Sequence, residues 1–356
     1  MLRYSSLPIR VIFGRWGIGI GCFINPSGIA VDLKGRILVA DNGNHRIQIF
    51  SSNGEFIKEF GGLGSKPMQF KHPSGIAVNS KNEILVADTD NHRIQIFDSE
   101  GEEVISDFYG FNNPSGITVD SKDEIFVTDE GTRQIIALQI SGEIVTRFGS
   151  SVFSGIRICH KDRLIVTNNI GHKVNIFDYN GDPIKEFGCE GSGPGQFKNP
   201  TGIAIDSKNR IIVADTNNHR IQIFGSNEEF ITGLGSEGSR PGQFHCPNRI
   251  GIDSRDRILI TDTLNNRIQI LPNLGFLIER DAFLKMSVEY LLKEFDGEFI
   301  ALLNGHVVVH DENEDDFYET VFKKYGDEHL YIKKINRNSL KEIGMFNEGG
   351  KNDGIL

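Results

Sequence analysis

The sequence predicts an all-β fold, a six-bladed β-propeller of four-stranded antiparallel blades, followed by a small α+β domain with the element order αββαβ. One observation is a motif of the form Asn-Pro-Ser-Gly-Ile-Ala-Val, which recurs six times at spacings of 47, 41, 39, 47 and 47 residues. A period of about 45 residues is typical of propellers. Each copy also holds short runs of Ile, Val and Phe bounded by Gly, Asn, Asp and Pro, as strands are. After Pro272 the apolar residues change to helical spacing.

The six copies differ in how closely they follow the motif. Four are clear and two are degenerate. The clear copies are Asn25–Val31, His72–Val78, Asn113–Val119 and Asn199–Ile205, and the degenerate ones are Ser154–Ile158 and Cys246–Ile252. One four-stranded sheet cannot bury both of its faces alone, whereas six sheets arranged radially cover one another. The alternative is a solenoid, but the chain lacks the consensus residues of leucine-rich and helical repeats.

The first repeat shows how a blade is expected to form. Its four strands are expected at Gly28–Asp32, Ile37–Asp41, Arg46–Phe50 and Glu55–Phe60. Connections this short join antiparallel neighbours, so each blade is a meander of strands a, b, c and d. The b–c turns and the d-to-a linkers then share one end of the strands, which we call the top face. The a–b and c–d turns share the opposite end, the bottom face.

The most distinctive sequence lies at the top face. Asn-His-Arg triplets preceded by Val-Ala-Asp and followed by Ile-Gln-Ile-Phe occur at Asn44–Arg46, Asn91–Arg93 and Asn218–Arg220. Together with the linkers Gly191–Phe197 and Gly238–Phe244, they resemble NHL repeats. The resemblance covers residues 1–271 and implies a six-bladed propeller. It does not imply one function, because the family includes RNA-binding regions of tripartite-motif proteins, an amidating lyase, sensor domains and scaffolds.

The glycine-rich N-terminal segment aligns with a later linker. Residues 13–26 match residues 187–200 without a gap, so the glycines are expected to supply turn conformations rather than a dinucleotide loop or a secretion signal. This alignment leaves Arg10–Phe13 as a strand ahead of the first complete repeat. We expect it to pair with the last blade and close the ring, which hides both open edges. The alternative is that Phe276–Glu279 supplies that strand. The propeller is therefore assigned to residues 1–275.

Charge and cysteine content narrow the function classes. Residues 1–271 carry 31 acidic and 28 basic residues, so the propeller is nearly neutral and has no basic stripe of the kind that binds nucleic acid generally. The four cysteines are widely spaced and form no Cys-x-x-Cys pair, which fits a reducing, cytoplasmic location. No apolar stretch approaches the roughly 20 residues that span a bilayer.

An acidic and a basic residue recur at the b–c turns. A feature repeated around a ring is expected to be architectural, and a buried carboxylate can be held by an arginine. These structural pairs are Asp41/Arg46, Asp88/Arg93, Asp215/Arg220 and Asp262/Arg267. The recurring histidines lack metal-ligand spacing. The sequence therefore predicts no catalytic residue, no metal site and no cofactor.

Two arginines replace small residues of the first strand. The residue after Gly-Ile is small or Thr in five repeats but Arg157 in the fourth, and the Gly itself is replaced by Arg249 in the sixth. The first strand of a propeller blade borders the central channel, so these arginines could form an anion site. The alternative is that each pairs with a nearby carboxylate or points to the rim.

Two linkers are shorter than the others, those entering the third and fourth blades. We expect them to leave a notch in the top face that binds a partner through aromatic side chains and one arginine. The expected notch residues are Tyr109, Phe111, Arg133, Phe153 and Asn169, with Arg157 and Arg249 at the adjoining channel. The alternative is that the aromatic side chains fill the blade interfaces.

The C-terminal part has its own pattern, which predicts a small α+β domain over residues 282–337 and a flexible tail over 338–356. The expected elements are a helix at Asp281–Phe295, a hairpin of Glu298–Leu303 and His306–His310, a helix at Asp315–Tyr325 and a strand at His329–Ile335. This unit resembles a small prokaryotic domain of unknown function.

The sequence favours a soluble interaction scaffold over an enzyme. We expect its top face to bind a protein or peptide partner and expect no contact with membranes. One alternative is a metal-dependent channel enzyme of the lyase or lactone-hydrolase type. Another is single-stranded RNA binding through stacking and arginine contacts.

Overall fold

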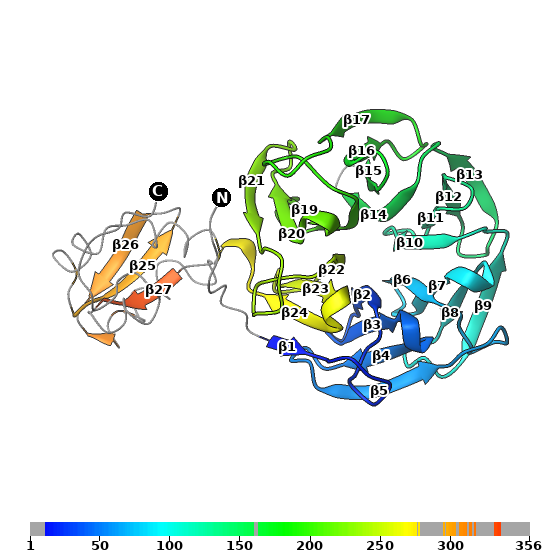
Figure 1. The fold of residues 1–356 in the computed structure, drawn as a ribbon, viewed down its shortest axis with the longest axis horizontal. Coiled ribbons are helices and arrows are strands. Elements are labelled where there is room, and N and C mark those ends of the chain that lie inside the picture. The colour runs from blue at the N-terminus through cyan, green and yellow to red at the C-terminus, as the bar shows by residue number, and fades with distance from the viewer. Residues whose placement is uncertain are drawn as a thin grey trace. The chain divides into compact units, whose positions relative to one another are not determined.

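The computed structural model describes residues 11–159 and 163–275. In the C-terminal region it describes residues 277, 295, 297–303, 306–311, 313, 314, 317 and 331–335. The chain divides into two units, residues 1–271 and 272–356. The first unit is a propeller of six four-stranded antiparallel sheets arranged around a central axis (Figure 1), which confirms the predicted fold class.

The blades follow one another in chain order. Blade one contains β2 (Pro26–Val31), β3 (Ile37–Asp41), β4 (Arg46–Phe50) and β5 (Phe56–Gly61), and blade two contains β6 (Pro73–Val78), β7 (Ile84–Asp88), β8 (Arg93–Phe97) and β9 (Val104–Tyr109). Blade three contains β10 (Pro114–Val119), β11 (Ile125–Asp129), β12 (Gln134–Leu138) and β13 (Ile144–Phe148), and blade four contains β14 (Phe153–Cys159), β15 (Arg163–Asn168), β16 (Lys173–Phe177) and β17 (Pro183–Phe187). Blade five contains β18 (Pro200–Ile205), β19 (Ile211–Asp215), β20 (Arg220–Phe224) and β21 (Phe230–Leu234).

Blade six joins the two ends of the propeller. It contains β22 (Pro247–Ile252), β23 (Ile258–Asp262) and β24 (Arg267–Leu271), and its outer strand is β1 (Val11–Phe13). β1 runs antiparallel to β24, with Val11 opposite Ile270 (Figure 1). The N-terminal strand thus occupies the edge of β24 that the alternative assignment gave to residues 276–279.

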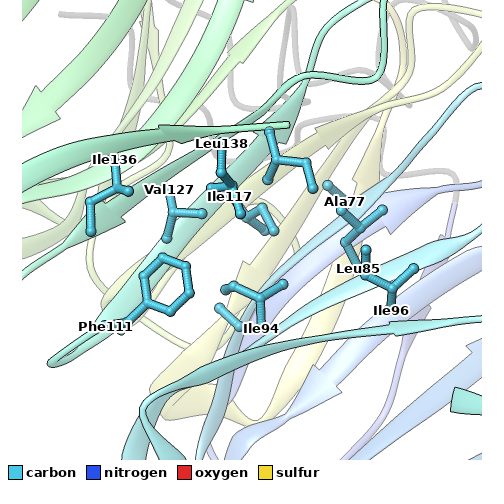
Figure 2. Packing of buried hydrophobic residues seen from close by; sticks show 11 residues of the cluster. Ala77, Leu85, Ile94, Ile96, Phe111, Ile117, Val127, Ile136 and Leu138 are labelled. Atoms are coloured by element: carbon cyan, nitrogen blue, oxygen red, sulfur yellow. The ribbon is translucent and has the colours of Figure 1, made fainter. Parts of the chain in front are cut away.

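Phenylalanines from the linkers fill the spaces between neighbouring blades. Phe23, Phe70, Phe197 and Phe244 are fully buried. The ring of Phe23 packs against Phe50 at 5.6 Å between centroids, and Phe70 packs against Phe97 at 5.5 Å. Figure 2 shows the equivalent cluster between blades two and three, where Phe111 meets Ile94, Ile117 and Val127. These contacts hold each linker over the interface that it crosses.

The first strands pack closely at the axis, and this packing requires glycine. A Cβ at Gly28 would lie 2.2 Å from the carbonyl oxygen of Ser74 in the next blade, and one at Gly116 would lie 2.1 Å from that of Ser154. Such distances are far inside van der Waals contact, so a side chain would push the blades apart. The motif glycine therefore sets the width of the channel.

Four of the b–c turns are single turns of 3-10 helix, η1 (Asn42–Asn44), η2 (Thr89–Asn91), η3 (Thr216–Asn218) and η4 (Thr263–Asn265). They belong to blades one, two, five and six, the blades that keep the Asp/Arg pair. In the C-terminal unit, β25 (Phe299–Leu303) lies between β26 (His306–Asp311) and β27 (Tyr331–Lys334), all antiparallel. Most of the two helices expected there lies outside the described residues. No described helix has the length and apolarity needed to cross a bilayer.

Deletion of residues 1–14 should lower the melting temperature sharply, because it removes β1 and exposes the edge of β24. Thermal unfolding followed by circular dichroism measures the effect. A melting temperature equal to that of the full chain would contradict a closing role for β1.

A charge cluster on the bottom face should make stability depend on pH. Hydrogen bonds from Arg36 and then Lys34 lower the pKa of Glu100 from its ordinary 4.5 to about 2. A depressed carboxyl pKa stabilises the fold above the ordinary value, and this contribution is lost as the pH falls from 4.5 towards 2. Glu100→Gln should therefore unfold more easily than wild type at pH 6 but equally easily near pH 2, with a difference below about 1 kcal/mol because the pair is partly solvated. Glu102→Gln, in the same turn but largely exposed, is the matched control for chemical denaturation. A constant difference at every pH would refute the assignment.

Candidate functional site

The Asp/Arg pairs of the top face are buried hydrogen-bonded networks. In blade five, Nε of Arg220 lies 2.7 Å from Oδ2 of Asp215, whose side chain is fully buried. The same carboxylate accepts hydrogen bonds from the Lys198 backbone N–H and from the side chains of Asn218 and Gln222. Its negative charge is therefore satisfied entirely within the protein.

Each arginine also fastens the linker that enters its blade. The Nη atoms of Arg220 donate to the backbone carbonyls of Ser192, Gly193 and Gln196 at 2.7–2.9 Å. The equivalent arginines hold the other three linkers in the same way. Arg46 reaches the carbonyls of Gly19 and Cys22, Arg93 those of Lys66 and Gln69, and Arg267 those of Arg240 and Gln243. Because the guanidinium donors are used by the fold, this geometry supports an architectural role for the pairs.

The recurring histidines connect one blade to the next. His45, His172 and His219 end their turns in the left-handed conformation, at φ values of 53–56°. Nδ1 of His172 accepts from the Asn199 backbone N–H at 3.0 Å, and Nδ1 of His219 accepts from that of Cys246 at 3.1 Å. Burial and then the neighbouring His72 lower the pKa of His45, which keeps that ring neutral and able to accept. These rings are positioned as hydrogen-bond acceptors at blade interfaces.

The expected notch aromatics are mostly buried. Phe111 is 8% exposed and Phe153 is 3% exposed, so neither side chain is available to a partner. Phe153 stands opposite Asn168, where other blades have the motif proline, yet its ring packs edge-on against Phe177 at 5.7 Å. It thus fills the blade interface that a linker phenylalanine fills elsewhere. The physical reason is that a shorter linker must still close the same apolar gap.

The remaining notch residues differ in their exposure and contacts. Tyr109 is 62% exposed at the end of β9, and Arg133 is exposed at the left-handed end of its turn, with φ of 58°. The side chain of Asn169 accepts from Asn199 of the next blade at 2.8 Å, so it belongs to a blade interface. Tyr109 and Arg133 alone remain as exposed candidates from this set.

An exposed apolar surface lies instead on the first linker, residues 14–25. Trp16, Ile18 and Ile20 are 73%, 77% and 68% exposed. The gap-free alignment of linkers places Glu190, Ser192 and Pro194 at the equivalent positions of the fifth linker. The glycines of this segment had indicated only that it forms turns. The signal that could have found it was the replacement of two polar residues and a proline by three apolar ones.

The backbone of the first linker is as well fixed as that of the others. The Gly17 N–H donates to Phe23 at 3.1 Å, as Gly191 does to Phe197. Arg46 binds the Gly19 carbonyl as Arg220 binds that of Gly193. The three apolar side chains therefore lie on a linker whose backbone is held by the same hydrogen bonds as the other linkers. Their exposure does not result from a loss of structure in this linker.

The two arginines that replace small residues of the repeat, Arg157 and Arg249, both line the channel. Arg249 extends from blade six across the axis and donates to the hydroxyls of Ser154 and Ser115, in blades four and three, at 2.9 and 2.8 Å. Arg157 lies one layer further along the channel and contacts only backbone carbonyls. Burial, and then the charge of Arg249, lowers the pKa of Arg157 to about 10, so the guanidinium remains cationic at pH 7. Among the described residues, no carboxylate forms an ion pair with either arginine.

Two known protein families match parts of this chain. The NHL repeat family matches residues 23–50, 70–97, 111–136 and 197–224, which are the linker phenylalanine and first three strands of blades one, two and five and most of that span in blade three. NHL repeats are thus found in four of the six blades. A family of unknown function, DUF5678, matches residues 290–337, the C-terminal domain. The resemblance drawn from the sequence is thus confirmed by NHL repeats in the propeller and by DUF5678 in the C-terminal part.

Among curated proteins, the chain is similar to Protein brain tumor of Drosophila melanogaster, with 33% identity over 180 residues. It is also similar to B-box type zinc finger protein ncl-1 of Caenorhabditis elegans, with 52% identity over 44 residues. These matches cover 50% and 12% of this chain but only 14% and 5% of those relatives. The activity of those longer proteins therefore does not transfer with the match.

Solved structures share the propeller fold with this chain. A protein of unknown function from Bacteroides thetaiotaomicron has a TM-score of 0.62 at 12% identity, covering 75% of each chain. A streptogramin B lyase has a TM-score of 0.56 at 14% identity, covering 73% of this chain and 96% of its own. A gluconolactonase from Xanthomonas campestris also has a TM-score of 0.56, at 16% identity, covering 70% and 87%. At these identities the likeness concerns the fold alone.

Arg220→Ala should destabilise the NHL propeller by about 3 kcal/mol or more, because it leaves the buried Asp215 without its charged partner. Chemical denaturation measures this loss. Lys173→Ala is the matched control, since Lys173 occupies the equivalent position in blade four and pairs with the exposed Glu186, a contact worth below about 1 kcal/mol. Equal losses in the two variants would argue against an architectural role for the arginine.

Proposed function

We propose that the NHL propeller is an interaction scaffold whose top face binds a protein partner through the first linker. The observation that carries this proposal is the exposure of Trp16, Ile18 and Ile20 on a rigid loop. Large exposed apolar groups are unfavourable in water unless another surface covers them. Trp is the residue most enriched among the anchors of protein interfaces, where it enters an apolar pocket. A protein or peptide that offers such a pocket is the partner whose chemistry fits this surface.

The neighbouring linker extends the same surface. Leu63 occupies the position in the second linker that Trp16 occupies in the first, and it is also exposed. In the fifth and sixth linkers this position is Glu190 and Glu237. The apolar character is therefore concentrated over blades one and two, and acidic residues stand at the matching positions further around the ring. This difference would orient a partner on the top face.

The residues of the channel give less support to a metal-dependent enzyme. Within the described part of the chain, no three His, Cys, Asp or Glu side chains gather as metal ligands. The two channel cavities are lined by glycine, small and aliphatic residues, Thr118 and two arginines. We also place the scaffold in the cytoplasm, since Cys22, Cys189 and Cys246 form no disulfide among the described residues, as expected in a reducing compartment.

The test exchanges the apolar linker residues for those of the fifth linker. The triple variant W16E/I18S/I20P should keep the melting temperature, because Glu190, Ser192 and Pro194 already fit the same backbone. Its binding of proteins captured from the source cell should fall at least tenfold, measured by quantitative pull-down against wild type. Trp16 is the single tryptophan of the chain, so its fluorescence should shift to the blue when a captured partner is added back.

Two controls decide whether the first linker is the binding surface. Leu33→Ser changes an exposed apolar residue of the bottom face and should leave binding unchanged. Tyr109→Ala tests the blade-three notch separately. If Tyr109→Ala abolishes capture while the linker variant binds normally, the notch is the binding surface and this proposal is wrong. Salt-sensitive binding to mixed RNA oligonucleotides, with no protein captured, would also overturn it.

A further inference from the structure

The central channel is closed at its waist and open towards the bottom face. The waist, ringed by Gly28, Gly75, Gly116 and Gly155, encloses a void of about 10 Å³, roughly the space for one water. Arg249 lies across it and is 8% exposed. Below the waist the channel widens into a cavity of about 200 Å³. Among the described residues, this waist separates the cavity from the top face.

The cavity exists because one layer of the first strands has small side chains. Going round the ring, this layer contains Ala30, Ala77, Thr118, Arg157, Ala204 and Gly251. The layer below it, which forms the mouth, is aliphatic and half-buried, with Val31, Val78, Val119, Ile205 and Ile252 lining the cavity. The cavity is lined by aliphatic side chains and by polar groups, among them Thr118 and Arg157 on the adjacent strands β10 and β14.

The half-buried guanidinium of Arg157 makes three contacts with the protein, all to backbone carbonyls. Its Nη1 donates to the Ile156 carbonyl at 2.9 Å and to that of Ile117 at 3.4 Å, and its Nη2 reaches the Ile250 carbonyl at 3.4 Å. Two of these three contacts are long, and all are to neutral oxygens. A buried cation normally has an anionic partner, because removing it from water without one costs several kcal/mol. Arg157 has none among the described residues.

The second arginine differs from the first. The Nη atoms of Arg249 donate to the hydroxyls of Ser115 and Ser154 and to the Thr201 carbonyl, at 2.8–3.1 Å. The side chain therefore lies across the channel at its waist. Its charge nevertheless adds to the positive potential of the cavity, because the first charge that acts on Arg157 is Arg249 and not a carboxylate. The acidic residues Asp206 and Asp253, which follow the mouth residues of blades five and six, are paired with Arg210 and Arg257.

We propose that this cavity binds a small monocarboxylate whose apolar body contacts the aliphatic walls and whose carboxylate accepts from Arg157 and Thr118. A carboxylate matches the planar fork of a guanidinium, and the one charge of Arg157 matches a single negative charge. Phosphate fits less well, since one guanidinium and one hydroxyl leave most of its oxygens facing aliphatic side chains. An apolar cavity of about 150 Å³ holds a ligand the size of benzene, so about six to eight non-hydrogen atoms fit here, as in butyrate or hexanoate.

The experiment titrates the full chain with hexanoate, hexanamide and inorganic phosphate by calorimetry. Hexanoate should bind saturably at one site, and hexanamide and phosphate should bind at least tenfold more weakly. Arg157→Gln should weaken hexanoate binding at least tenfold. Arg255→Ala, which removes an exposed arginine from a bottom-face turn, should leave it unchanged.

A second variant tests the space rather than the charge. A Cβ at Gly251 would meet its nearest neighbours at 3.6 Å, an ordinary contact, so Gly251→Val fits the strand while filling the cavity. It should also weaken hexanoate at least tenfold with Arg157 intact, and its melting temperature shows that it folds. The proposal is overturned if hexanoate does not bind, if hexanamide or phosphate binds as well as hexanoate does, or if both variants bind like wild type.

Discussion

In five blades, the second strand ends at an aspartate whose carboxylate is buried away from water. The groups that donate hydrogen bonds to this carboxylate determine how the top face is arranged. In blade five these groups are a backbone N–H of the linker and the side chains of Asn218, Arg220 and Gln222. In blade three, which has a shorter linker and no arginine, Asp129 accepts from the backbone N–H groups of Asn112 and Asn113 instead. The constraint is the same although the donors differ. A linker of either length is thus fixed by the carboxylate beneath it.

The features that could be predicted from the sequence are those encoded by neighbouring residues. The motif spacing predicted the blades, and Asp41 and Arg46 are five positions apart on paired strands, so their contact follows once the strands are assigned. For Phe153 the sequence left two alternatives, partner binding or filling of a blade interface, and its ring fills the interface from the position of the motif proline. The exposure of Trp16 was missed because apolar residues are expected to be buried. The polar Glu190, at the same position of another linker, indicated that this position is exposed.

The two arginines of the channel show how a repeat can acquire a new property at little structural cost. Five blades keep the glycine whose absence of a side chain lets the first strands meet, and the sixth replaces it with Arg249. The long side chain passes over the axis rather than between strands, so the ring stays closed. Arg157, in contrast, stands where its neighbours are small, and its charge is opposed by desolvation. Tension of this kind between stability and charge is common where proteins bind ligands.

The closing strand has a consequence for the order of events during synthesis. Val11 leaves the ribosome before any complete blade, but its partner Ile270 is made only after the first five blades have been completed. Until then β1 has no partner, and β1 of one chain can pair with β24 of another chain that is already complete. Such an exchange gives a domain-swapped dimer with the same strand contacts as the monomer. Which form accumulates therefore depends on chain concentration during folding, since ring closure within one chain competes with pairing between two.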